Sequence, residues 1–137
     1  YLFDTLYKLC DVLSVKAKLS VDLKAAYDRN DRQMLLEIKD AVLPRLISKL
    51  DSFYESFFHQ WHEENKSFGF EVQVIRLGGL KTRMEYVQKR IEQYLRGEIL
   101  KIEELEIPRK PFSYFETTDY NKIIYNLWNV IVTPSVM

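Results

Sequence analysis

One long apolar stripe constrains the fold of this chain more than any other feature of its sequence. Large apolar residues recur at steps of three or four positions, which is the spacing of one face of an α-helix. The members of this stripe are Leu35, Ile38, Val42, Leu46, Leu50, Phe53, Phe57 and Trp61. A helix over residues 32–62 would be about 45 Å long. Because Pro44 lies inside it and lacks an N–H group, a kink or break is predicted near Leu43.

A second amphipathic pattern begins at the adjacent glycines Gly78 and Gly79, with its first member just before them. Its apolar members keep the helical spacing and are Leu77, Leu80, Met84, Val87, Ile91 and Tyr94. Gly97 is predicted to end this helix, and Gly69, which tolerates a positive φ, is predicted to end the region of the first one. Two long helices joined by a short linker are expected to lie antiparallel.

The remaining parts of the chain add shorter elements. Glycine and proline are scarce, with four of each in 137 residues, which favours helices over many short strands. After Gly97 we expect a short helix that ends before Pro108, an extended segment to Pro111, and a helix over about 120–130. The predicted fold is therefore an all-α antiparallel helical bundle. Its two long helices are joined by a short glycine-containing turn and followed by a short C-terminal helix and an extended segment.

Two further helices are predicted near the N-terminus, over about 2–13 and 15–29, with Ser14 capping the second. The first carries a one-sided apolar face made of Leu2, Leu6, Leu9, Val12 and Leu13. Cys10 lies in the same apolar pattern and is predicted to be a small core residue. Asn30 and Asp31 are predicted to stop the second helix and to cap the long one.

Composition limits the classes of partner. Twenty basic and twenty acidic residues cancel, so there is no electrostatic reason to expect nucleic acid or an acidic membrane as partner. No apolar run is long enough to span a bilayer, and the first residues lack the pattern of a signal peptide. The single cysteine excludes an intramolecular disulfide and suits a reducing compartment, so we expect a cytoplasmic protein. The first residue is tyrosine, which leads us to expect a fragment of a longer protein.

The best metal candidate is the group His59, His62 and Glu63. Two histidines three positions apart lie on one face of a helix, where a metal can bind them. The spacing is not HExxH, and the sequence has no third histidine to complete a shell. A solvated or capping role is therefore favoured, and no metal or cofactor is expected.

Other catalytic patterns are equally weak. Glu63–Glu64 and Glu103–Glu104 are adjacent carboxylates, but their charged neighbours give no reason for the raised pKa that a glycosidase acid needs. Cys10 has no nucleophile elbow, and the glycine pair lacks phosphate-loop spacing. The basic residues Arg76, Lys81, Arg83, Lys89 and Arg90 alternate with acidic residues, which argues against nucleic-acid binding. No catalytic residue is predicted in this chain.

Several specific residues mark the junction of the two long helices. They are Trp61, Asn65, Lys66, Phe68, Gly69, Arg76, Leu77, Gly78 and Gly79. Together they resemble the C-terminal helical domain of one subgroup of glycoside hydrolase family 20, the exo-acting β-N-acetylhexosaminidases. The resemblance is strongest over residues 61–97, extends more loosely over most of the chain, and includes residues 126–131.

The resemblance implies that catalysis takes place in another domain. In that family the catalytic domain is a (β/α)₈ barrel in which an adjacent Asp–Glu pair acts on the substrate. None of the eight aspartates of this chain is followed by glutamate, and 137 residues are too few for such a barrel. No catalytic residue is carried over from the family.

What the resemblance does imply is an accessory role. Residues 1–137 would form one helical domain, the C-terminal fragment of a larger glycosidase, which packs on the barrel of the same chain or forms a homodimer. The candidate interface residues are Trp61, Asn65, Lys66, Arg76, Gly78, Gly79 and Arg83. Each also has an interpretation that involves no partner. Trp61 would lie in the core of this domain, Asn65 and Lys66 would cap a helix, and the two arginines would lie on the free surface. The alternative functions are a free-standing helical interaction module and a small helical enzyme or metal protein built around His59 and His62.

Overall fold

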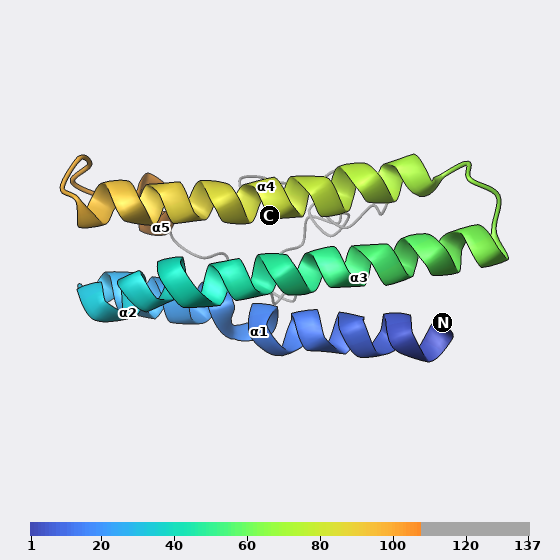
Figure 1. The fold of residues 1–137 in the computed structure, drawn as a ribbon. Coiled ribbons are helices and arrows are strands. Elements are labelled where there is room, and N and C mark those ends of the chain that lie inside the picture. The colour runs from blue at the N-terminus through green and yellow to red at the C-terminus, as the bar shows by residue number, and fades with distance from the viewer. Residues whose placement is uncertain (108–137) are drawn as a thin grey trace, which may run out of the picture. The chain divides into compact units, whose positions relative to one another are not determined.

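The computed structural model describes residues 1–107, which are helical and contain no strand (Figure 1). The elements in chain order are α1 (Leu2–Asp28), α2 (Arg32–Glu37), the π-helical turn η1 (Ile38–Val42), α3 (Leu43–Glu64), α4 (Phe70–Leu95) and α5 (Glu103–Glu106). The all-α prediction is therefore confirmed for this part of the chain. Contacts divide the chain into Tyr1–Leu105 and Glu106–Met137. The extended segment after Pro108 and the helix over about 120–130 that the sequence predicts lie outside the described residues.

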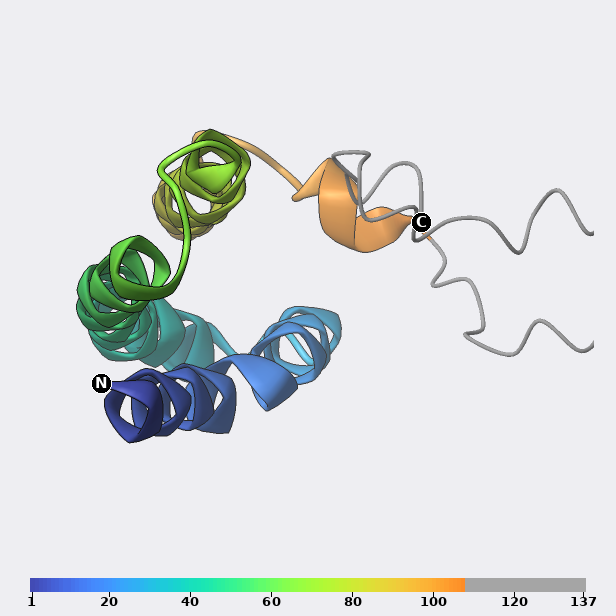
Figure 2. The same cartoon turned by 90° about the vertical axis from the view of Figure 1, so that its right-hand side faces the viewer.

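Within the first unit, α3 is the central helix. Viewed end-on in Figure 2, α3 lies between α1 and α4, and it contacts both of them. Figure 1 shows that α3 and α4 run antiparallel, as the sequence predicts. The start of α1 lies beside the end of α3, and the Thr5 hydroxyl on α1 donates to the carbonyl of Ser56 on α3 at 3.2 Å.

The long apolar stripe contributes Leu35, Ile38, Leu46, Leu50 and Phe53 to the core, and the other helices supply the rest. The largest side chains that are completely buried are Leu35, Ile38, Leu43, Leu46 and Ile91. They come from α2, η1, α3 and α4, so the core joins all the elements of the middle of the chain. Each such side chain stabilises the fold by about 1.5–3 kcal/mol relative to an exposed one.

A π-helical turn precedes Pro44 and interrupts the α-helix. The five residues that precede α3 form η1, and Pro44 occupies the first turn of α3. Proline cannot donate to the preceding turn and its ring crowds the carbonyl there. A π-helical turn is a common way to accommodate such an interruption inside a long helix. The interruption expected near Leu43 is present, and it takes the form of a local change in hydrogen bonding.

The helix ends follow the sequence closely. α1 and α4 are each followed by a residue with positive φ, 52° for Asn30 and 76° for Gly97. In both cases the next N–H group donates to the carbonyl five residues earlier, at 2.8 and 2.9 Å, which closes the last turn. The Asp31 carboxylate accepts from the backbone N–H of Met34 at 3.0 Å and caps α2. The predicted roles of Asn30, Asp31 and Gly97 are confirmed. Gly69 has the expected positive φ of 94°, but it precedes α4 instead of ending α3.

The first 28 residues differ from the prediction in two respects. They form one continuous helix and not two, and Ser14 lies in its interior, where its hydroxyl donates to the carbonyl of Asp11 at 2.7 Å. A serine that bonds within its own turn does not need to end the helix. The expected apolar face is also wrong. Of its members only Val12 is buried, the four leucines are exposed, and Cys10 is exposed instead of lying in the core.

The reason lies in the side of α1 that faces α3. The Ser56 hydroxyl on α3 donates to the Asp4 carboxylate at 2.5 Å and accepts from the Lys8 ammonium at 2.6 Å. About two turns further along α1, Asp11 pairs with Lys49 of α3 at 2.5 Å. The hydrogen bond from Ser56, together with Lys8, lowers the pKa of Asp4. The contact between the first half of α1 and α3 is therefore largely polar.

Candidate functional site

The junction of α3 and α4 contains three of the predicted interface residues. The half-buried indole of Trp61 donates from Nε1 to the carbonyl of Lys66 at 2.9 Å, and Asn65 ends α3 with an extended backbone. A Cβ placed on Gly69 would lie 3.5 Å from the Trp61 ring, so the indole covers this glycine. Trp61 and Lys66 thus contact each other within the turn.

An aromatic cluster holds this junction closed. Phe70, at the start of α4, is only 4% exposed. Its ring centroid lies 5.2 to 6.0 Å from those of five α3 rings, namely Tyr54, Phe57, Phe58, Trp61 and His62. Aromatic pairs at these distances add about 0.5–1.5 kcal/mol each beyond the area that they bury. The cluster therefore anchors the turn between the two long helices.

The other four predicted interface residues lie along α4. Gly78 and Gly79 are exposed, and a Cβ on either would have no atom within 4 Å. The described residues therefore make no close approach to this pair. The Arg83 guanidinium lies over the ring of Tyr86, 5.4 Å from its centroid, and Arg76 is half-buried. The seven candidates thus form two separate groups, one in the turn and one along α4.

Both histidines are engaged in contacts along α3. The Nδ1 atom of His62 lies 2.8 Å from the carbonyl of Phe58, and its ring packs on that of Phe58. The Nδ1 atom of His59 lies 4.0 Å from Glu63, and its ring meets Tyr1 edge-on. Within residues 1–107 no group of three or more His, Cys, Asp or Glu side chains could hold a metal ion.

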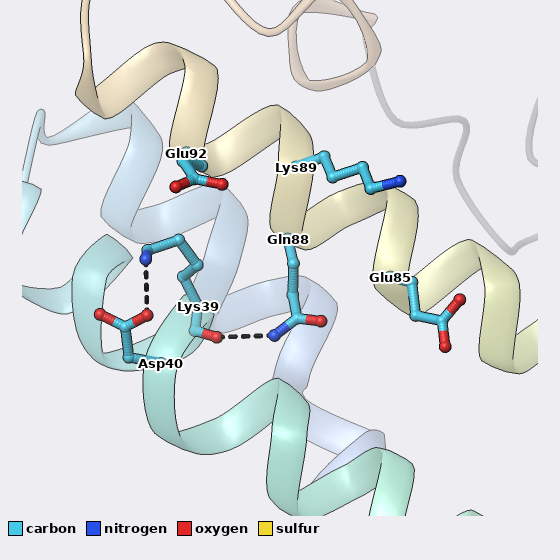
Figure 3. Close-up of a pocket in the computed structure, with 6 residues that line it drawn as sticks. All are labelled: Lys39, Asp40, Glu85, Gln88, Lys89 and Glu92. Carbon is cyan, nitrogen blue, oxygen red and sulfur yellow. Dashed lines mark hydrogen bonds and ion pairs between the residues drawn. The ribbon is translucent and has the colours of Figure 1, made fainter.

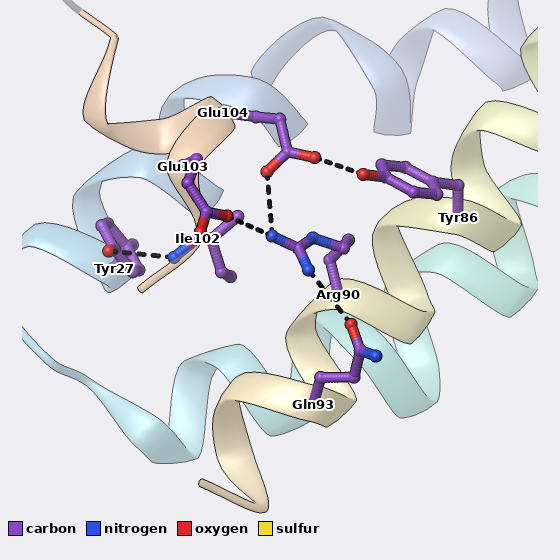
Figure 4. A network of polar contacts seen from close by, with 7 residues as sticks. All are labelled: Tyr27, Tyr86, Arg90, Gln93, Ile102, Glu103 and Glu104. Carbon is purple, nitrogen blue, oxygen red and sulfur yellow. Dashed lines mark hydrogen bonds and ion pairs between the residues drawn. The ribbon is translucent and has the colours of Figure 1, made fainter. Parts of the chain in front are cut away.

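A polar network ties α5 to α4 (Figure 4). The Arg90 guanidinium of α4 donates to Glu103 and lies 3.5 Å from Glu104, while the Tyr86 hydroxyl donates to Glu104 at 2.5 Å. Burial opposes the charge on Glu104, but the bond from Tyr86 and the cation of Arg90 outweigh it and lower the pKa of this carboxyl. The same bond raises the pKa of Tyr86. One of the two carboxylate pairs noted in the sequence therefore serves as an attachment between helices.

The residues just before α5 complete this attachment. Ile102 is 4% exposed, and its backbone N–H donates to the hydroxyl of Tyr27 on α1 at 3.2 Å (Figure 4). The sequence did not predict the Arg90 network, because its partners lie beyond the end of α4. Tyr86 and Arg90 are four positions apart and share one helix face, which is the only signal that the sequence offers.

A charged surface depression of about 380 Å³ lies between η1 and α4 (Figure 3). Its lining residues are Lys39, Asp40, Glu85, Gln88, Lys89 and Glu92. Lys39 pairs with Asp40 at 2.5 Å, and its carbonyl accepts from the Gln88 amide at 2.9 Å. Figure 3 shows the side chains of Glu85 and Lys89 directed away from that pair. The charged groups do not converge on a common point, so the depression lacks the paired geometry of a hydrolytic site.

The described geometry defines a class of protein. In residues 1–107 the buried side chains join long helices, and the polar clusters connect one helix to the next. This part of the chain is an all-helical domain. None of the helices described is long and apolar enough to cross a membrane.

Comparison with known families gives the more specific identification. The family model of the Glycoside Hydrolase 20C C-terminal domain matches residues 1–125, which is most of the chain. The chain belongs to this family, and the resemblance seen in its sequence is confirmed. It is therefore a C-terminal domain from the glycosidases. No curated protein matches the chain.

Proposed function

We propose that this chain is a non-catalytic helical accessory domain of a β-N-acetylhexosaminidase, an enzyme that removes terminal β-linked GlcNAc or GalNAc. The observation that carries the proposal is the family match over residues 1–125. The partner of the domain would be the catalytic (β/α)₈ barrel of the same parent chain, which this domain stabilises and orients. The parent enzyme would be cytoplasmic, and the alternative to packing on the barrel is that the domain joins two copies of the enzyme as a homodimer.

The state of two carboxyl groups supports a structural role. A glycosidase needs a general acid that keeps its proton near neutral pH, and therefore a raised pKa. Asp4 and Glu104 each have a lowered pKa, because a hydroxyl donor from a neighbouring helix and a nearby cation stabilise their charged forms. These groups fit the connection of helices and do not fit the protonation of a leaving group.

The proposal is tested on the parent enzyme, with and without residues 1–137. The complete enzyme is expected to hydrolyse a chromogenic β-GlcNAc glycoside, and removal of the domain is expected to shorten its half-life at elevated temperature. Light scattering and cell fractionation test the homodimer and its location. A reading frame that encodes no barrel before Tyr1 would contradict the proposal and favour a free-standing interaction module. An unchanged half-life after deletion would contradict the stabilising role.

A further inference from the structure

The first half of α1 carries an outward apolar surface. We call it the outer α1 face, and it consists of Leu2, Phe3, Leu6, Tyr7, Leu9 and Leu13. These side chains are between 36% and 87% exposed, with Phe3 the most exposed and Leu9 the least. If a whole aromatic side chain offers about 200 Å², Phe3 and Tyr7 alone expose on the order of 300 Å². With the leucines, the face reaches the size of the largest apolar patches on monomeric proteins, about 300–600 Å².

The polarity of this helix half is the reverse of that of an ordinary surface helix. The charged residues between Tyr1 and Leu13 are Asp4, Lys8 and Asp11. All three pair with each other or with α3, through Ser56 and Lys49. A surface helix normally presents its charges to water and its leucines to its own core. Here the side chains directed away from the domain are apolar, which is the pattern of a helix that is covered from outside.

We infer that the outer α1 face docks on the catalytic domain that precedes this domain in the parent chain, an inference that rests on the proposed function. A C-terminal domain follows its catalytic domain, so the connection reaches α1 at its N-terminal end, where the exposed side chains are concentrated. A direct covalent connection gives a high effective concentration, on the order of millimolar for a short linker, so a modest apolar contact is enough.

The chemistry of the face specifies its partner surface. Its three nearby charges are already paired on the opposite side of the helix, so the outer α1 face offers shape and apolar area but no cation or anion. The complementary surface on the catalytic domain is therefore apolar and uncharged. The exposed surface of α4 is not uncharged in this way, because Glu71 and Arg76 lie among its apolar residues, such as Ile75.

Cys10 is a native reporter for this contact. It is exposed in the domain and lies on the helix between residues of the outer α1 face. In the parent enzyme, its labelling by N-ethylmaleimide is followed by mass spectrometry of the peptide that contains it. The matched control is Ile75→Cys in the same enzyme, since Ile75 is 56% exposed and Leu6 is 57% exposed. Both rates are divided by the rates in denaturant to remove differences in intrinsic reactivity.

We expect Cys10 to be labelled at least tenfold more slowly than the cysteine at position 75. The pair Leu6→Lys and Leu13→Lys is expected to remove this protection, whereas Val74→Lys with Ile75→Lys leaves it unchanged. All four positions are exposed in the domain, so circular dichroism is expected to show the same helix content for both variants. Equal labelling of the two cysteines in the parent enzyme would overturn the inference.

A photo-crosslinker identifies the occupant directly. p-Benzoylphenylalanine replaces Leu6 in the parent enzyme, with the same replacement at Ile75 as control. Crosslinks from position 6 to the catalytic domain support the inference. Crosslinks to residues 108–137, or to a second copy of the chain, overturn it. If the enzyme hydrolyses its substrate and loses heat stability on deletion while Cys10 is labelled freely, the docking face is wrong and the proposed function stands.

Discussion

Replacement of the two helical glycines of α4 by alanine is expected to stabilise the domain. Gly78 and Gly79 lie inside α4, where glycine costs about 0.5–1 kcal/mol relative to alanine. Among residues 1–107 a Cβ at either position meets no atom within 4 Å, so no steric term from this part of the chain opposes the gain. The variant with both Gly78→Ala and Gly79→Ala should therefore gain about 1–2 kcal/mol. For a domain of this size, each kcal/mol raises Tm by roughly 3–5 °C.

Alanine at the other two glycines is expected to lower the stability of the domain instead of raising it. Gly69 and Gly97 have φ values of 94° and 76°, which L-residues adopt at a cost of about 1–2 kcal/mol. A Cβ at Gly69 would be 3.5 Å from Trp61, an ordinary contact, so the cost arises from the backbone. Gly69→Ala and Gly97→Ala should each destabilise the domain by that amount, and they serve as matched controls.

Urea and thermal unfolding of residues 1–137, followed by circular dichroism at 222 nm, measure all four changes. A loss of stability in the double alanine variant of Gly78 and Gly79 would refute the reasoning, because it would mean that another part of the folded chain packs against them. In the parent enzyme the same variant also tests the predicted interface role of the glycine pair. If the variant raises the stability of residues 1–137 alone but lowers the heat stability of the parent enzyme, the result would support that role.

Three further predictions concern the core, a cap and a titrating group. Leu46→Ala removes a side chain with 0% exposure and should cost about 2–5 kcal/mol in urea unfolding, so a cost below 1 kcal/mol would show that this core is loosely packed. Asp31→Ala removes the cap of α2 and should cost about 0.5–2 kcal/mol, whereas an unchanged midpoint would mean that the hydrogen bond to Met34 contributes nothing. Glu104 has a pKa below its ordinary value of 4.5, so it stabilises the fold above that pH and loses this contribution as pH falls through the folded pKa. The stability difference between the native chain and Glu104→Gln should accordingly be largest at neutral pH and shrink below 4.5, and a difference that grows in acid would contradict the sign of the shift.

The elements that the sequence predicts well are those that local chemistry determines. The apolar stripe from Leu35 to Phe53 is buried except for the half-buried Val42, because a helical spacing of three and four positions leaves a single face for the core. Asn30 and Gly97 end helices because few other residues adopt positive φ at low cost. Asp31 caps α2 through a bond that spans only three positions.

The features that the sequence did not predict depend on distant partners. Leu2, Leu6, Leu9 and Leu13 have the spacing of a buried face, but the polar contacts with Ser56 and Lys49 on α3 place the other side of the helix against the domain. Asp4, Lys8 and Asp11 also share one side of the helix, a signal that the leucine pattern hid. Cys10 was assigned to the core for the same reason and is exposed.

The candidate site shows the same division. Trp61 was predicted to lie at an interface or in the core, and Lys66 to lie at an interface or to cap a helix. The indole of Trp61 donates to the carbonyl of Lys66 within the turn, and the interface role of both residues stays a prediction. The glycine pair has the open surroundings that an interface requires, and its role in docking stays a prediction. Arg83 lies over the ring of Tyr86, and its role at an interface stays a prediction as well.

Release of the chromophore from a β-GlcNAc glycoside by purified residues 1–137, measured beside the parent enzyme at equal molar concentration, tests the central claim most directly. The account predicts turnover by the parent and no release above the protein-free blank by residues 1–137, because the acid and the substrate-orienting carboxylate belong to another domain. Turnover that copurifies with residues 1–137, and that disappears when one of their own carboxylates is substituted, would contradict it.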